Sequence, residues 1–216
     1  MLKHFFVTIP GLEDSMQSSI LGSPPSYQNN NIETIISQIL SIQSTNKALN
    51  FYLEEDSINV GDRPGDATKR LENLRHYLYG HWTASHILVG EAPGYQGARF
   101  SGIPFTSQYL LYDYGRKEPS ASIVWKTLRE LKIENKVILW NSFLLHPHNE
   151  KLLSNRRPTT EEIFSCNNIL SQICQDRIVV PIGKIAELAT KSTFCIRHPA
   201  YGGAILFKEG LKQIFY

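Results

Sequence analysis

Apolar residues recur every three or four positions in four stretches of the chain, as they do on the buried face of a helix. Asp66 is a candidate N-cap for the second stretch, which stops at Gly80. Pro158, followed by Thr159 and Glu162, gives the start signal of a capping box in the fourth stretch. We predict helices over residues 32–43, 66–80, 122–131 and 157–174.

Four shorter apolar runs lie between or beyond these helices, at residues 86–90, 136–140, 177–183 and 194–197. Each is too short to make a helix and suits a buried strand. Strands that alternate with helices at this interval are typical of crossover units, which place parallel strands in one sheet with helices on both faces. The pattern therefore predicts an α/β fold.

The segments that follow the four predicted strands are expected to meet in space. Ligands of open parallel sheets bind beyond the carboxyl ends of the strands. The four segments read GEAPGYQG, NSFLLHPH, GKIAEL and HPAYGG. We therefore expect a carboxylate (Glu91), an amide (Asn141), the start of a helix and a histidine (His198) at one edge of the sheet.

Each of these three side chains also has an ordinary explanation. A glutamate after a strand suits a solvated turn, an asparagine suits a turn cap, and a lone histidine is usually a surface residue. The glycines around Glu91 favour a ligand, because they let the backbone approach one closely, and Pro104 presents Phe105 to the same region. The sequence has no phosphate-loop or dinucleotide motif. Together the residues favour a planar ligand with a hydrogen-bonding edge, next to a carboxylate.

Length and composition fit one main domain with an extra segment in front of it. The chain has 216 residues, 42% of them hydrophobic, and no run approaches the roughly 18 to 20 apolar residues of a membrane helix. Residues 15–33 are polar and interrupted by proline. We divide the chain into an N-terminal arm with a polar linker and one helix, residues 1–60, and a main domain, residues 61–216. We expect a cytoplasmic protein that does not bind membranes.

Charge is unevenly distributed, although the net charge is only +2. Residues 1–62 carry two lysines and seven acidic residues, whereas residues 63–216 carry twenty lysines or arginines and thirteen acidic residues. The basic excess therefore lies with the candidate site, where it permits contacts to phosphates without requiring them.

The three cysteines, Cys166, Cys174 and Cys195, are odd in number and widely spaced. This arrangement does not suit a disulfide framework or a zinc site. We expect reduced, buried thiols, and neither a metal ion nor any other cofactor.

Four motifs, in this order, resemble those of the uracil-DNA glycosylase superfamily: GEAPG at 90–94, G-x-P-F at 102–105, N-x-x-x-x-H-P at 141–147 and H-P-A at 198–200. The resemblance extends over roughly residues 84–210. It implies a three-layer α/β/α sandwich with a central four-stranded parallel sheet, and a catalytic domain over residues 61–216. It also implies a monofunctional DNA glycosylase of base excision repair, which flips uracil or another deaminated base out of DNA and hydrolyses its N-glycosidic bond.

The resemblance assigns roles by position. Glu91 and His198 are the catalytic residues: the first acts on the water, and the second supports negative charge on the leaving base. Phe105 stacks on the base and Asn141 reads its edge. Tyr95 is grouped with them as base-binding, although it lies one position past the place where some members set a tyrosine against the thymine methyl group. The choice of base therefore stays open.

The chain also departs from the family pattern. Members that begin with GEAPG usually hold an iron–sulfur cluster on four cysteines, whereas here only Cys166 falls at a matching position and Leu145 occupies another. The cluster is therefore not expected. The spacing from Gly90 to Phe105 is one residue longer than in those members and resembles the single-strand-selective monofunctional type. The family's H-P-S is H-P-A here, which removes a hydroxyl that often contacts phosphate.

The expected partner is DNA that contains a damaged base, bound by a monomer of the chain. We assign DNA binding to Pro93, Lys184, Arg197 and Pro199; because Lys184 starts a helix, we expect no lyase step through its amine. Two other functions stay open: a lesion-sensing module that has lost turnover, and a hydrolase of free nucleosides or nucleotides. A basic face around the site would argue against the last of these. The residues that would form it are Arg99, Arg156, Arg157, Lys184 and Arg197.

Overall fold

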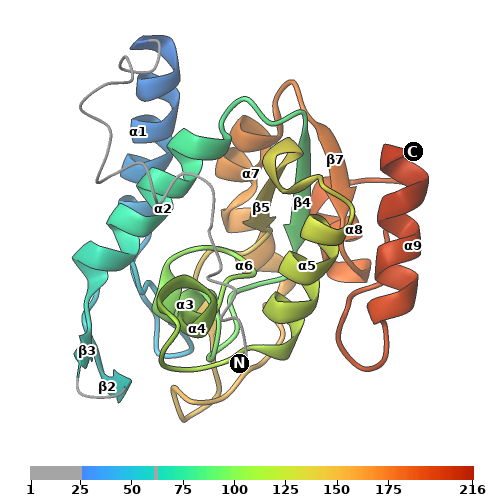
Figure 1. Cartoon of the computed structure of the whole chain (residues 1–216). Coiled ribbons are helices and arrows are strands. Elements are labelled where there is room, and N and C mark those ends of the chain that lie inside the picture. Colours follow the sequence, from blue (N-terminus) through green and yellow to red (C-terminus); the bar gives the residue numbers. More distant parts are fainter. Residues whose placement is uncertain (1–25, 61–62) are drawn as a thin grey trace.

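The structure, a computed structural model, describes residues 26–60 and 63–216 (Figure 1). Its helices are α1 (Ser26–Ser41), α2 (Ala67–His81), α3 (Ala98–Ser101), α4 (Gln108–Tyr112), α5 (Pro119–Glu130), the 3-10 turn η2 (Glu134–Lys136), α6 (Thr160–Ser165), α7 (Asn167–Cys174), α8 (Lys184–Thr190) and α9 (Ala204–Phe215). Its strands are β1 (Ala48–Leu49), β2 (Asp56–Val60), β3 (Arg63–Gly65), β4 (His86–Gly90), β5 (Val137–Asn141), β6 (His146–Pro147) and β7 (Ile178–Pro181). Most of the predicted polar linker, residues 15–33, lies outside the described residues.

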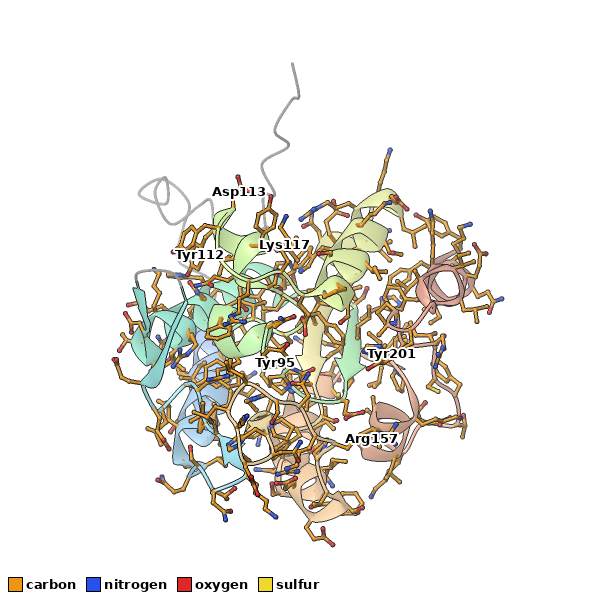
Figure 2. All side chains as sticks on the ribbon, turned by 90° about the horizontal axis from the view of Figure 1, so that it is seen from below. Tyr95, Tyr112, Asp113, Lys117, Arg157 and Tyr201 are labelled. Atoms are coloured by element: carbon orange, nitrogen blue, oxygen red, sulfur yellow. The ribbon has the colours of Figure 1, made fainter. Side chains whose placement is uncertain are left out.

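Three parallel strands form the central sheet, in the order β5, β4, β7. Strand β4 coincides with its predicted apolar run, β7 lies within its run, and β5 is shifted by one residue so that it includes Asn141. The middle strand is buried along nearly its whole length. Helix α5 lies on one face of this sheet and α7 on the other (Figures 1 and 2). The remaining strands form two separate antiparallel pairs, β1 with β6 and β2 with β3. The predicted α/β class is confirmed.

The fourth predicted strand, residues 194–197, does not form, so the central sheet has three strands rather than four. A single parallel bridge joins Ile196 to Ile182. The N–H of Ile196 donates to the carbonyl of Pro181, and the N–H of Gly183 donates to the carbonyl of Ile196, each at 2.9 Å. Pairing stops there because Gly183, at φ 86°, turns the chain away from the line of β7 into helix α8.

The predicted helices form, with shifted ends. Helix α2 lies within one residue of its prediction, and the Asp66 carboxylate accepts the N–H of Lys69 at 3.0 Å as its cap. Helix α1 begins at Ser26 instead of residue 32. Helix α5 begins at Pro119, three residues earlier than predicted, because proline is well suited to the first turn.

The helix predicted over residues 157–174 is two helices, α6 and α7, separated at Cys166. The capping box is present as predicted: the N–H of Glu162 donates to the Thr159 hydroxyl at 3.2 Å, and the Glu162 carboxylate accepts the N–H of Thr159 at 2.7 Å. The break occurs where Cys166 leaves the helical region, with φ −96° and ψ 0°, while its buried side chain stays in the core.

Helix α1 belongs to the same hydrophobic core as the central sheet. It packs against α2 and α7 through buried isoleucines, and β1 pairs with β6 more than ninety residues later in the chain. Among the described residues, the predicted boundary after residue 60 therefore does not separate two cores. The buried isoleucines of α1 are Ile32, Ile35, Ile36 and Ile39.

Candidate active site

Glu91 and Asn141 are close together because their strands pair in parallel. Gly90, the last residue of β4, lies opposite Asn141, the last residue of β5. The pairing continues past both strands, since the N–H of Ser142 donates to the Gly90 carbonyl at 2.9 Å and the N–H of Phe143 to the Glu91 carbonyl at 3.0 Å. The Ser142 hydroxyl also donates to the Glu91 carbonyl, at 2.8 Å. These bonds hold the backbone of Glu91 at the edge of the sheet.

Phe105 is held at the same edge by a tight turn between α3 and α4. Its φ is 52°, in the left-handed region, and its ring is buried. The Ser101 hydroxyl donates to the carbonyl of Thr106 at 2.6 Å and accepts the N–H of Ile103 at 3.0 Å. The indole N–H of Trp125 donates to the Thr106 hydroxyl at 3.0 Å. A bulky residue in this backbone region is uncommon, and the surrounding bonds fix it there.

Gly90 leaves the space that the Phe105 ring fills. A Cβ on Gly90 would lie 2.3 Å from Cζ of Phe105 and 3.0 Å from Oδ1 of Asn141. We expect Gly90→Ala to displace both side chains and to lower the free energy of unfolding by about 1 to 3 kcal/mol, as overpacked cores do. Urea denaturation measures this, with Gly80→Ala on the exposed side of α2 as the control that should not destabilise. A Gly90→Ala protein as stable as the unchanged chain would show that this glycine does not set the ring position.

His198 lies between the bridge at Ile196 and helix α9. The N–H of Ala200 donates to its Nδ1 at 3.1 Å, so the neutral ring carries its proton on Nε2. Burial, and to a smaller extent the charge of Arg197, lower the pKa of His198. The site therefore contains a neutral imidazole that donates through Nε2.

The carboxyl of Glu91 is half-buried. Loss of solvent raises its pKa, and the nearby charge of Arg157 partly opposes that shift. Its oxygens accept no hydrogen bond from another residue in the described ranges. A carboxylate in such a place is a stronger base than one in water, and its oxygens are available to a water molecule or a ligand.

These side chains meet in one cavity. This inner cavity has a volume of about 50 Å³ and lies beside a wider outer groove of about 570 Å³. The side-chain amide of Asn141 is nearly buried there, without a hydrogen-bond partner among the described residues. Glu91, Glu118 and His198 border both spaces. The inner cavity is lined by Glu91, Ala92, Pro93, Gly94, Ala98, Phe105, Glu118, Ser120, Asn141 and His198.

His146, from the N-x-x-x-x-H-P motif, supports the site without lining the inner cavity. Its Nδ1 lies 2.9 Å from the carbonyl of Pro93, and its Nε2 lies 3.0 Å from the carbonyl of Leu152. Burial lowers the pKa of His146 to about 4, so the neutral ring donates to one of these two carbonyls. The histidine thereby connects the loop after β4 to the segment after β6.

Tyr95 and Pro199 are not placed with the other predicted residues. Tyr95 borders neither the inner cavity nor the outer groove. In Figure 2, which looks onto the carboxyl ends of the strands, it lies near the middle of the face, with Tyr201 and Arg157 to one side. Pro199 is buried and does not border the groove. The other predicted DNA-binding residues, Pro93, Lys184 and Arg197, do border it.

The basic residues considered for a DNA-facing surface separate into two groups. Arg99 is fully buried and donates to the carbonyl of Leu152 at 2.8 Å, so it does not belong to the surface. Two of the others have carboxylate partners, Glu162 and Glu187, which leaves Arg157 and Arg197 without a salt bridge to any described residue. The four that border the outer groove are Arg156, Arg157, Lys184 and Arg197.

Sequence reasoning missed several residues that border the outer groove, among them Glu118 and Tyr201. Glu118 lies at the start of α5 and also lines the inner cavity. Tyr201 is 99% exposed and has φ 52°. Each had a signal in the sequence: an acidic residue directly before a helix-starting proline in E-P-S, and an aromatic residue between H-P-A and two glycines.

Two features that would indicate other functions are absent from residues 26–60 and 63–216. No three His, Cys, Asp or Glu side chains lie close enough together to hold a metal ion. None of the helices combines the length and the apolar character needed to cross a membrane. The three cysteines are free thiols.

The comparisons with known proteins give matches among solved structures and none among family models or curated sequences. Among solved structures, the crystal structure of wild-type SMUG2 from Pedobacter heparinus is similar, with a TM-score of 0.60 and 12% identity. The similarity covers 86% of this chain and 96% of that one. At this identity it shows a shared fold.

Proposed function

We propose that the chain is a monofunctional DNA glycosylase, which hydrolyses the N-glycosidic bond of uracil or another deaminated base in DNA. The observation that carries the proposal is the meeting of Glu91, Phe105, Asn141 and His198 in one inner cavity at the carboxyl ends of β4 and β5. These residues come from four separate motifs, and each supplies a different part of the chemistry. The fold shared with SMUG2 from Pedobacter heparinus supports the proposal.

In this proposal the inner cavity recognises a base that has left the DNA stack. Unstacking costs a few kcal/mol, which contacts in the cavity must offset. The ring of Phe105 provides a stacking surface. The amide of Asn141 has no hydrogen-bond partner among the described residues, so its donor and acceptor are available to the N–H and carbonyl on the edge of a deaminated base.

Bond cleavage in the proposal divides between Glu91 and His198. As the bond between the sugar and the base nitrogen breaks, its electron pair goes to the base and the sugar gains oxocarbenium character. The Nε2–H of His198 donates to a carbonyl oxygen of the leaving base and stabilises its charge. The Glu91 carboxylate stabilises the cation and takes a proton from the water that adds to the sugar.

The outer groove suits the DNA backbone in this proposal. Arg157 and Arg197 border it without a salt bridge to any described residue, so they can neutralise phosphates beside the extruded nucleotide. Tyr201 stands fully exposed at the same border, where an aromatic ring can stack against the bases next to the lesion. These features favour a DNA substrate over a free nucleoside.

The proposed function is tested with oligonucleotides that carry a single uracil, hypoxanthine or xanthine, each in single and double strands. We expect base release under single-turnover conditions, detected as alkali-labile abasic sites, from at least the uracil substrate. Release from free deoxyuridine alone would indicate a nucleoside hydrolase. Selective binding of the lesion without any release would indicate a lesion-sensing module.

A further inference from the structure

Glu118 directs its carboxyl against the loop that follows β4. Its Oε1 lies 2.6 Å from the point where a Cβ on Gly94 would stand. Both of its oxygens would lie within 2.7 Å of a Cβ on Gly97. The closer oxygen leaves no space for any side chain at position 97. Glycine at these two positions therefore leaves the space that the carboxyl occupies. That space is part of the inner cavity, which Glu118 lines together with Glu91 and Asn141.

No structural role accounts for this carboxyl. Glu118 is the N-cap residue of α5, yet its side chain makes no capping hydrogen bond. Within the described ranges it also has no ion pair and no other side-chain hydrogen bond. A partly exposed carboxyl that borders a cavity and has no partner among the described residues has lost part of its hydration, and we infer that a ligand supplies the missing partner.

We propose that Glu118 touches the bound base and is a specificity-determining residue of the inner cavity. The proposal rests on the function proposed above. Glu118 comes from the start of α5, whereas Asn141 comes from the end of β5, so the two polar groups can approach one carbonyl oxygen of the base from different sides, at its two lone pairs. The ligand group expected at Glu118 is the carbonyl oxygen that deamination introduces in place of an amino group.

The protonation state of Glu118 decides what it can bind. Burial raises the pKa of its carboxyl to about 7. A neutral carboxyl donates its O–H to a carbonyl oxygen, whereas a carboxylate only accepts and repels that oxygen. Recognition of a deaminated base is therefore expected to weaken as the pH rises through this pKa. The charged or titratable groups that border the outer groove, or directly precede Glu118 in the chain, are Glu91, Arg116, Lys117, Arg156, Arg157, Lys184, Arg197 and His198.

The test compares binding of an oligonucleotide with one 2′-fluoro-2′-deoxyuridine, whose glycosidic bond resists hydrolysis, at pH 6.0 and pH 8.5. At the higher pH a group with a pKa near 7 is roughly 30-fold less protonated. The affinity of the unchanged chain is expected to fall by up to that factor. Glu118→Gln cannot ionise, and its affinity should lose this pH step. Glu118→Ala should bind more weakly than the unchanged chain at pH 6.0, where the carboxyl donates, but not at pH 8.5, where the carboxylate repels the base, and it should also lack the step.

The matched control is Glu209→Gln, an exposed glutamate on α9, which should follow the unchanged chain. It accounts for the general effect of removing one negative charge. If Glu118→Gln and the unchanged chain respond to pH in the same way, Glu118 does not touch the base and the proposal is wrong. If the pH step is present but ordinary uracil is never released, the proposed glycosylase activity is wrong while the role of Glu118 in binding stands.

Discussion

Replacing Glu91 by Gln is expected to slow single-turnover base release by roughly 100-fold or more, with lesion binding nearly unchanged. Glutamine has the same shape but cannot take a proton from water, and it stabilises a developing cation poorly. Both interactions strengthen mainly in the transition state. The backbone of Glu91 is held by hydrogen bonds from Ser142 and Phe143, so the substitution should leave the loop in place.

The pH profile provides a second readout of the same variant. Burial raises the pKa of Glu91, and the proposed reaction needs its ionised form. The rate of the unchanged chain should therefore fall as the pH drops through a midpoint above the usual range of a glutamate, and this limb should be missing in Glu91→Gln. Glu150→Gln, an exposed glutamate, is the control and should keep both the rate and the limb. Full single-turnover activity of Glu91→Gln would contradict the catalytic role given to this residue.

The meeting of the motifs could be predicted because it follows from a rule of topology. Three short apolar runs form parallel strands, and parallel strands end at the same edge of the sheet. Once β4 and β5 pair in this register, Gly90 lies opposite Asn141 independently of the conformation of the loops. The helix N-caps could also be predicted, because the side chains of Asp66 and Thr159 accept hydrogen bonds from backbone N–H groups only three residues away.

Other features depend on contacts that no local pattern specifies. The bridge at Ile196 could not be distinguished from a strand, because the pairing is ended by the turn of a different segment at Gly183. Glu118 reaches the inner cavity because the start of α5 lies against the loop after β4, where its carboxyl is next to Gly94 and Gly97. The direction of the Tyr95 side chain likewise depends on that loop, so its spacing from Glu91 did not settle its position.

Asn141→Asp is expected to weaken both binding and base release for a uracil oligonucleotide at pH 8. Asn141 is only 4% exposed, and its amide contacts the base already in the bound ground state of the proposed reaction. An ionised aspartate would replace a donor by a charge that faces the carbonyl of uracil. A buried polar contact that becomes repulsive costs about 3 kcal/mol, which corresponds to roughly 100-fold in affinity.

The same substitution should change the preference between bases, which separates recognition from a loss of folding. Cytosine carries an amino group where uracil carries a carbonyl oxygen, so an aspartate should reduce the advantage of uracil over cytosine in competition binding. Asn168→Asp makes the same charge change on the exposed side of α7 and should leave both affinities as they were. Unchanged uracil affinity in Asn141→Asp would mean that the amide does not read the base. An equal loss of affinity for uracil and cytosine would indicate that Asn141 maintains the shape of the cavity and does not recognise the base.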